Sequence, residues 1–261
     1  MNIVVCIKQV PNTNDVKIDP ETNTLIRKGV ESIINPYDLH AIEEALRLTD
    51  NYGGKVTVIS MGPPQVKESL KNAISLGVDD VILLSDRAFA GADTLATSYT
   101  LARGIEKIAD YDLVLCGKQA IDGDTGQVGP GIAEQLGLPH ITYIRNIIDV
   151  QKGQITAERE IEDGFEEIVI QLPGVLTILK KINEPRLPSI RGILRSREIE
   201  VPIWSVKDLD VDETAIGLDG SPTKVVSINT PDLETEGEIY RGKPQEQVNK
   251  LVTQLSDKQL I

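Results

Sequence analysis

GKQAIDGDTGQVGPG, residues 117–131, joins a short apolar run to a helical pattern and is the most informative stretch for the fold class. Glycine recurs through the stretch, so backbone N–H groups can approach a bound anion closely, and an anion at the following helix would meet its positive amino end. We predict a strand–loop–helix unit whose loop binds a nucleotide phosphate. A long turn without a ligand is the alternative.

Outward from this loop, short apolar runs alternate with helical patterns through the first 145 residues. Such runs are typical of strands buried on both faces of a parallel sheet. They cover residues 3–8, 55–61, 80–85, 112–117 and 141–144. The helical patterns cover residues 36–51, 65–76, 94–109 and 127–136. This alternation predicts an α/β fold with a doubly wound, mostly parallel sheet.

Other segments depart from this alternation. Residues 16–19 and 24–26 predict a β-hairpin before the first helix. Four strand-like runs after residue 145 predict an antiparallel meander beside the sheet, at 147–150, 154–161, 167–171 and 175–180. Residues 183–203 are rich in Pro and Arg and are predicted to be exposed. We expect an α/β domain over 1–219 and a C-terminal arm over 220–261, with a helix at 243–255.

Composition excludes several functions. The chain has 27 Lys and Arg against 40 Asp and Glu, a formal charge of −13, and it is poor in aromatic residues. We therefore expect neither nucleic-acid nor membrane-surface binding. No apolar run is long enough for a transmembrane segment, and residues 2–7 are expected to be a strand and not a signal peptide. Cys6 and Cys116 are predicted to be core thiols of a cytoplasmic protein.

More specific nucleotide-binding, calcium-binding and catalytic motifs are absent from the sequence. No P-loop is present, and Lys8-Gln9-Val10-Pro11 stands where a GxGxxG loop would follow the first strand. Asp122-Gly123-Asp124 lacks the twelfth-position Glu of a calcium loop. We predict Asp124 or Thr125 to be a helix N-cap. His40 and His140 have no catalytic partners in sequence and are expected to be structural. No metal cluster and no catalytic side chain are predicted, so any redox chemistry requires a bound cofactor.

Five short motifs, taken together and in order, resemble the β subunit of electron-transfer flavoproteins. They are residues 5–11, 35–38, 61–63, 117–122 and 183–186. The resemblance extends from residue 2 to about residue 215. It implies an adenine-nucleotide-binding α/β domain that pairs with an α subunit holding an FAD. We expect the C-terminal arm, 220–261, to pack on that α subunit.

The resemblance leaves the cofactor of this subunit open between two classes. Residues 122–130 resemble the bifurcating class, which implies an FAD that accepts a hydride from NADH. One electron would go to ferredoxin or flavodoxin, and the other through the α-subunit FAD to an acyl-CoA or lactate-type dehydrogenase. The alternative is an electron shuttle whose β subunit holds structural AMP. A non-redox nucleotide sensor of the universal-stress-protein type is a second alternative, but it gives no reason for residues 183–197.

The resemblance also implies residue roles. Backbone contacts would line the adenosine pocket, hydroxyls would add contacts, and the glycine-rich turn would hold phosphates. The adenosine side would comprise Cys6, Ile7, Lys8, Asn35, Asp38, Met61 and Gly62, with Asp122 at the ribose or in the turn. The phosphate side would comprise Gly126, Gln127, Val128, Gly129, Pro130, Gly131 and Ile132, with hydroxyls from Thr94, Thr97 and Thr125; for Thr94 and Thr97 the alternative is a local role beside an Asp93 N-cap. The partner-docking loop, 183–197, would present Leu187, Pro188, Ile190 and Arg191 to the dehydrogenase.

Overall fold

The computed structural model describes residues 1–12, 32–151, 153–226 and 237–261. The chain divides into two units, residues 1–226 and residues 227–261. The predicted hairpin at residues 16–19 and 24–26 lies outside the described residues.

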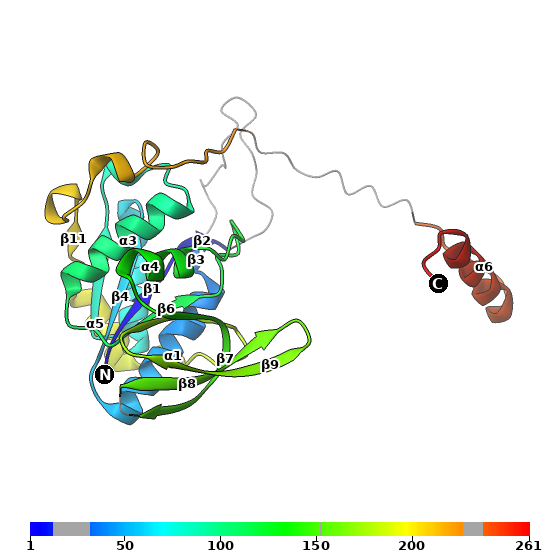
Figure 1. Cartoon of the computed structure of the whole chain (residues 1–261), viewed down its shortest axis with the longest axis horizontal. Coiled ribbons are helices and arrows are strands. Elements are labelled where there is room, and N and C mark those ends of the chain that lie inside the picture. The colour runs from blue at the N-terminus through cyan, green and yellow to red at the C-terminus, as the bar shows by residue number, and fades with distance from the viewer. Residues whose placement is uncertain (13–31, 152, 227–236) are drawn as a thin grey trace. The chain divides into compact units, whose positions relative to one another are not determined.

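The first unit is built on a nine-stranded sheet with the order β11-β5-β4-β1-β6-β10-β7-β8-β9 (Figure 1). Its strands are β1 (Asn2–Cys6), β4 (Lys55–Met61), β5 (Asp80–Leu84), β6 (Leu113–Gly117), β7 (His140–Gln151), β8 (Gln154–Ile161), β9 (Gly164–Gln171), β10 (Gly174–Ile178) and β11 (Ile203–Trp204). A separate two-stranded ribbon pairs β2 (Gln9–Pro11) with β3 (Ser32–Ile34).

Every neighbouring pair from β11 to β7 is parallel, and β7, β8 and β9 are antiparallel. The doubly wound, mostly parallel α/β fold is thus confirmed. The predicted four-strand meander is wrong in two respects. Residues 141–144 and 147–150 belong to one strand, β7, and β10 inserts between β6 and β7, parallel to both. All residues of β10 are buried, as expected of an interior parallel strand.

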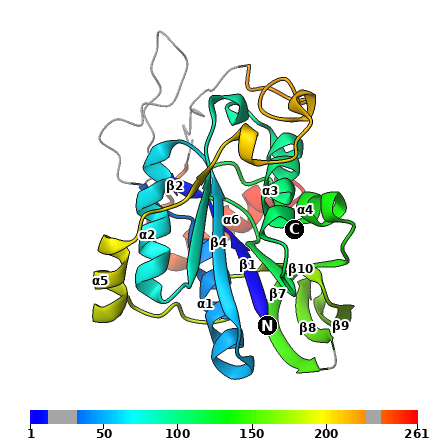
Figure 2. The ribbon, with the colours of Figure 1, turned by 90° about the vertical axis from the view of Figure 1, so that its left-hand side faces the viewer.

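Helices cover both faces of the sheet. They are α1 (Pro36–Tyr52), α2 (Lys67–Leu76), α3 (Thr94–Ile108), α4 (Val128–Leu136) and α5 (Ile190–Glu198), with short 3₁₀ turns η1 (Pro64–Val66), η2 (Arg87–Phe89), η3 (Val206–Asp208) and η4 (Glu213–Ala215). Figure 2 shows α1 and α2 on one side of the strands and α3 and α4 on the other. The strand period of two divides the core accordingly: in β1, Ile3 and Val5 join the cluster under α1 and α2, while Val4 and Cys6 join the cluster under α3 and α4.

Helix α5 corrects the expectation that residues 183–197 form a loop. Its amino end is capped by Ser189, whose hydroxyl accepts from the Gly192 N–H at 2.9 Å. Gly192 is the buried residue of the helix, and a Cβ there would strike the Ser75 carbonyl oxygen of α2. The helix packs on α2 through Gly192, while Ile190, Ile193 and Leu194, which stand at helical spacing, remain exposed. That spacing is a sequence signal for the helix that the loop expectation overlooked.

The second unit contains α6 (Pro244–Asp257), which confirms the predicted helix at 243–255 to within two residues. Val248, Leu251 and Val252 lie at helical spacing on it, and each is about half exposed. Among the described residues, none of the helices combines the length and the apolar character that crossing a membrane requires.

Candidate functional site

The candidate site lies where β1 and β6 end side by side. Cys6 and Cys116 are register partners near these ends, and the chain continues from β1 and from β6 to opposite sides of the sheet. In doubly wound sheets this reversal of strand order leaves a crevice outside the carboxyl ends of the strands. The segment after Cys6 and the loop 117–127 therefore meet at one edge.

Lys8 ties these two segments together, from the β1 side. Its backbone N–H donates to Asp38 Oδ2 at 2.7 Å, and its Nζ pairs with Asp122 Oδ1 at 2.7 Å. The structure thus brings together three of the predicted site residues. Ile7 is buried in the core, so its side chain faces away from the crevice.

Asp38, in the first turn of α1, is a buried carboxyl at the base of this edge. Burial raises its pKa to about 7, against the opposite effect of hydrogen bonds from the Asn35 side chain and the Lys8 backbone. Asn35 occupies the N-cap position of α1, but its side chain does not cap the helix and bonds elsewhere.

Cys6 and Cys116 are both buried, as expected of core thiols. A hydrogen bond with Cys116, together with burial, raises the pKa of the Cys6 thiol well above its usual range. The thiol of Cys6 is therefore protonated at neutral pH and is a poor nucleophile. Its side chain belongs to the core below the site.

The amino end of α4 opens onto the same edge. Asp124 and Gly126 are both left-handed, with φ of 54° and 63°, so the chain makes a further turn before the helix begins at Val128. The prediction that Asp124 or Thr125 is the N-cap is therefore wrong: Gln127 is the N-cap, and its side chain makes no capping bond. The first N–H groups of the helix are left for water or an anion.

A side chain added at Gly129 or at Gly131 would point into the protein interior. A Cβ on Gly129 would lie 2.5 Å from Thr177 Cγ2 of β10, and a Cβ on Gly131 would strike Ser98 of α3. The two glycines thus let α4 pack closely on its neighbours, a reason that the sequence interpretation did not include. Ile132 is fully buried and contributes its side chain to the core.

The start of α3 is joined to the start of α4. Asp93 caps α3 by accepting from Leu95 N at 2.9 Å and Ala96 N at 3.1 Å, as the local alternative anticipated. The Thr94 hydroxyl donates to Gln127 Oε1 at 2.9 Å. Thr94 therefore lies beside the phosphate-side residues.

Other predicted residues lie on the neighbouring strand end or on the surface. Met61 ends β4, and the Gly62 N–H donates to the Leu84 carbonyl at 3.0 Å. In the docking segment, Leu187 and Ile190 are 87% and 82% exposed. Pro188 and Arg191 are exposed as well.

Two lysine–tyrosine contacts at this edge were not predicted. Lys118 Nζ lies 5.1 Å from the ring centroid of Tyr143, and Lys180 Nζ lies 4.6 Å from that of Tyr37. Tyr143 has φ of 61° at a register irregularity between β7 and β10. Lys118 and Tyr37 stand inside the quoted motifs, whereas Tyr143 and Lys180 carry no sequence signal.

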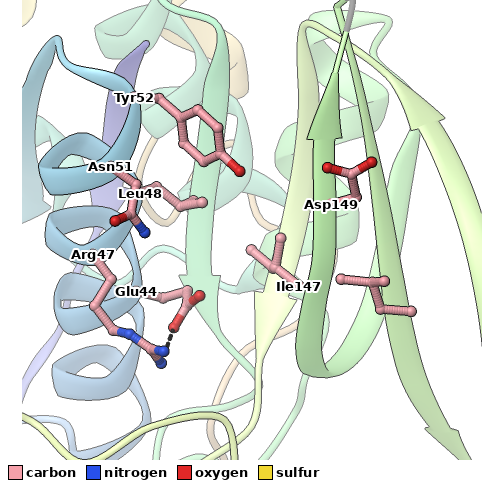
Figure 3. A pocket seen from close by; sticks show the side chains of 8 residues that line it. Glu44, Arg47, Leu48, Asn51, Tyr52, Ile147 and Asp149 are labelled. Carbon is pink, nitrogen blue, oxygen red and sulfur yellow. Dashed lines mark hydrogen bonds and ion pairs between the residues drawn. The ribbon is translucent and has the colours of Figure 1, made fainter.

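Two surface hollows are lined by residues other than the predicted site residues. One, of about 90 Å³, lies between α1 and β7, where Figure 3 shows the Glu44–Arg47 ion pair on the helix side facing Ile147 and Asp149. The other, of about 270 Å³, is lined by residues of 87–90 and 213–219. Within the described ranges, no group of His, Cys, Asp or Glu side chains could hold a metal ion.

The strand order and the uncapped amino end of α4 at the strand reversal define a doubly wound α/β protein with a candidate binding edge. Comparison with known proteins assigns its family. The model of the electron transfer flavoprotein domain matches residues 22–209. The chain therefore belongs to the electron transfer flavoprotein family.

Similar proteins share the full length of this chain. It is 53% identical to the electron transfer flavoprotein subunit beta of Thermoanaerobacterium thermosaccharolyticum and 50% identical to that of Clostridium acetobutylicum, each over 100% of both chains. It is also 48% identical, again over 100% of both chains, to the caffeyl-CoA reductase-Etf complex subunit CarD of Acetobacterium woodii.

Proposed function

We propose that this chain is the β subunit of a heterodimeric electron-transfer flavoprotein and binds FAD at the edge where β1 and β6 end. The observation that carries the proposal is the uncapped amino end of α4 at this edge. A dinucleotide brings phosphates, and phosphates are stabilised by the free N–H groups and the dipole of a helix amino end.

The residues at the edge suit such a group. On the phosphate side, the N–H groups of Val128 and Gly129 and the hydroxyl of Thr125 would hold the phosphates, while the Thr94 hydroxyl donates to Gln127 Oε1 and orients that side chain. On the adenosine side, the backbone after Cys6 and the end of β4 at Met61 and Gly62 would hold the adenosine. Bound FAD would supply the redox chemistry, which protein side chains lack. The chain's own residues bind and orient it.

We further propose that this FAD accepts a hydride from NADH and that its two electrons separate. One would go to ferredoxin or flavodoxin, and the other through the α-subunit FAD to a dehydrogenase. The resemblance of residues 122–130 to the bifurcating class supports this, as does the 48% identity to a subunit of a caffeyl-CoA reductase-Etf complex. We propose an acyl-CoA or lactate-type dehydrogenase as partner, and a cytoplasmic location.

The cofactor content of the purified heterodimer tests the proposal. We expect two FAD per heterodimer, and NADH should reduce the flavin of this subunit before that of the α subunit. One FAD with one AMP, and no bleaching by NADH, would establish the AMP-holding shuttle instead. Bound ATP without flavin would point to a nucleotide sensor.

A further inference from the structure

Asn35 lies at the junction of three segments that form the site. It follows β3 and precedes α1, and it is 1% exposed. Its backbone N–H donates to the Lys8 carbonyl at 2.9 Å, which joins it to the segment after β1. Its own carbonyl accepts from the Asp38 N–H at 2.9 Å at the start of the helix.

The Asn35 side chain reaches the third segment, the loop after β6. Its Oδ1 accepts from the Ile121 N–H at 3.2 Å, and its Nδ2 donates to the Gln119 carbonyl at 2.9 Å. The second Nδ2 hydrogen goes to Asp38 Oδ1 at 2.9 Å. Both donors of the amide are used inside the protein, so the side chain has none left for a nucleotide.

We propose that Asn35 is a positioning residue that fixes the loop 119–122 against the segment after β1 and so sets the span between the adenosine and phosphate sides of the site. This inference rests on the proposed function. It replaces the expected direct contact of Asn35 with the nucleotide by an indirect role.

The Asp38 carboxylate, which accepts from the Lys8 and Gly117 backbone, also links these segments, whereas a further side-chain link is weaker. The Lys8–Asp122 ion pair is partly exposed, with the Lys8 side chain 51% accessible, and water screens such pairs. The Asn35 bonds are buried or partly buried, and leaving a buried partner unsatisfied is costly. Asn35 is therefore expected to hold residues 119–121 more firmly than this ion pair does.

The test uses Asn35→Asp in the purified heterodimer after removal of its nucleotides. The new carboxylate keeps an acceptor for Ile121 but faces the oxygens of Gln119 and Asp38. FAD and AMP are titrated by calorimetry. We expect affinity for the bound nucleotide to fall by about tenfold or more, because two hydrogen bonds are lost and oxygen atoms now face each other. The double variant Asn35→Asp with Asp38→Asn restores a donor–acceptor pair and should recover part of the affinity.

Asn183→Asp is the matched control. Asn183 also binds α1 with both amide donors, to the His40 carbonyl at 3.0 Å and to Glu44 Oε2 at 2.9 Å. The substitution therefore likewise places the new carboxylate against one backbone carbonyl and one carboxylate. It lies in the docking segment and should leave nucleotide affinity unchanged.

A second measurement covers the case in which Asn35→Asp does not fold. Asn35→Ala removes the acceptor of the Ile121 N–H, so amide hydrogen exchange at Ile121 should accelerate in the nucleotide-free protein. Unchanged exchange there, unchanged affinity in Asn35→Asp, or an equal loss in Asn183→Asp would overturn the inference. If the wild-type protein binds neither FAD nor AMP, the proposed function fails instead, and exchange at Ile121 alone then decides whether Asn35 holds the loop.

Discussion

Arg186 binds the buried carboxylate of Glu43 by three hydrogen bonds. Its Nε donates to Glu43 Oε2 at 2.8 Å, its Nη2 to Oε1 at 3.1 Å, and its backbone N–H to Oε2 at 3.0 Å. The hydrogen bond to Glu43 raises the pKa of Arg186, which stays charged. The basic docking segment is thus anchored on α1, the helix whose first turn carries Asp38. Leu187 follows directly, and its side chain is exposed.

Arg186→Met tests this anchor. Glu43 is 7% exposed, and the substitution leaves its carboxylate without the guanidinium that binds it. We therefore expect a loss of about 2 kcal/mol in the free energy of unfolding. Urea titration measures it. Arg197→Met, an exposed change in the same segment, should have no effect. Adding Glu43→Gln to Arg186→Met should recover part of the loss, and a loss of the same size in the double variant would show that Glu43 is not the partner that matters.

Leu187→Ala tests docking apart from stability. The side chain is 87% exposed, so its removal should leave the melting temperature and flavin content unchanged. If Leu187 enters a pocket on the dehydrogenase, truncation should slow electron transfer to that partner by about tenfold, as for an apolar contact at the centre of an interface. Stopped-flow reduction of the purified dehydrogenase provides the rate. Val225→Ala, 79% exposed outside the docking segment, is the control, and an unchanged rate for Leu187→Ala would refute this role.

The positions of most strands along the chain follow from local patterns. The predictions that were wrong concern contacts between residues far apart in the sequence. The runs at 55–61 and 154–161 match β4 and β8 because apolar spacing alone sets them. The insertion of β10 depends on pairing with β6 and β7, which no local pattern encodes. Asn35 stands at the N-cap position, where the sequence pattern favours Asn. Its side chain nevertheless forms hydrogen bonds with Gln119 and Ile121, more than 80 residues away.

Asp38→Asn should change how stability depends on pH. The folded-state pKa of Asp38 is about 7, above the value near 4 of an unfolded Asp, so the folded protein binds the proton more tightly. The contribution of Asp38 to the free energy of unfolding therefore falls as pH rises from about 4 to about 7. In Asp38→Asn this fall should be absent, which urea titrations at pH 5, 6, 7 and 8 can detect.

Asp86 provides the control for that pH series. Hydrogen bonds from the Ala88 and Val206 backbone lower its pKa, so its stabilising effect is present above its unfolded pKa and is lost only as pH falls below it. Asp86→Asn should thus leave the slope between pH 5 and 8 unchanged. A wild-type slope in Asp38→Asn would mean that Asp38 titrates normally.

Leu251→Asp tests whether α6 contacts the α subunit. An apolar stripe on α6 consists of Val248, Leu251 and Val252, and the helix has no buried residue. Contact of this stripe with another protein surface would remove it from water and stabilise the helix. We expect the charge to weaken heterodimer assembly by about tenfold or more, because burying an unpaired carboxylate is costly. Analytical ultracentrifugation at falling concentration measures it. Asn249→Asp on the same helix should assemble normally, and equal assembly of both variants would leave α6 outside the interface.

Gly129→Ala tests whether α4 must pack closely on β10 for the nucleotide to bind. The new methyl group would lie 2.5 Å from Thr177 Cγ2, so α4 must shift away from β10. Such overpacking costs about 1–3 kcal/mol, and we expect lower stability together with loss of the FAD of this subunit and of NADH oxidation, while the α-subunit flavin stays bound. Gly123→Ala, in the same loop with nothing within 4 Å of its Cβ, should be silent.

Thr177→Ser separates packing from direct phosphate contact at Gly129. It removes the clashing methyl group but keeps the hydroxyl oxygen that accepts from the Tyr143 N–H at 3.1 Å. If Gly129 is required to seat α4, the double variant Gly129→Ala with Thr177→Ser should regain stability and FAD together. If it regains stability but remains without FAD, the substitution disturbs the position of the Gly129 N–H at the phosphate and not the packing of α4. Full FAD content in Gly129→Ala alone would contradict both roles.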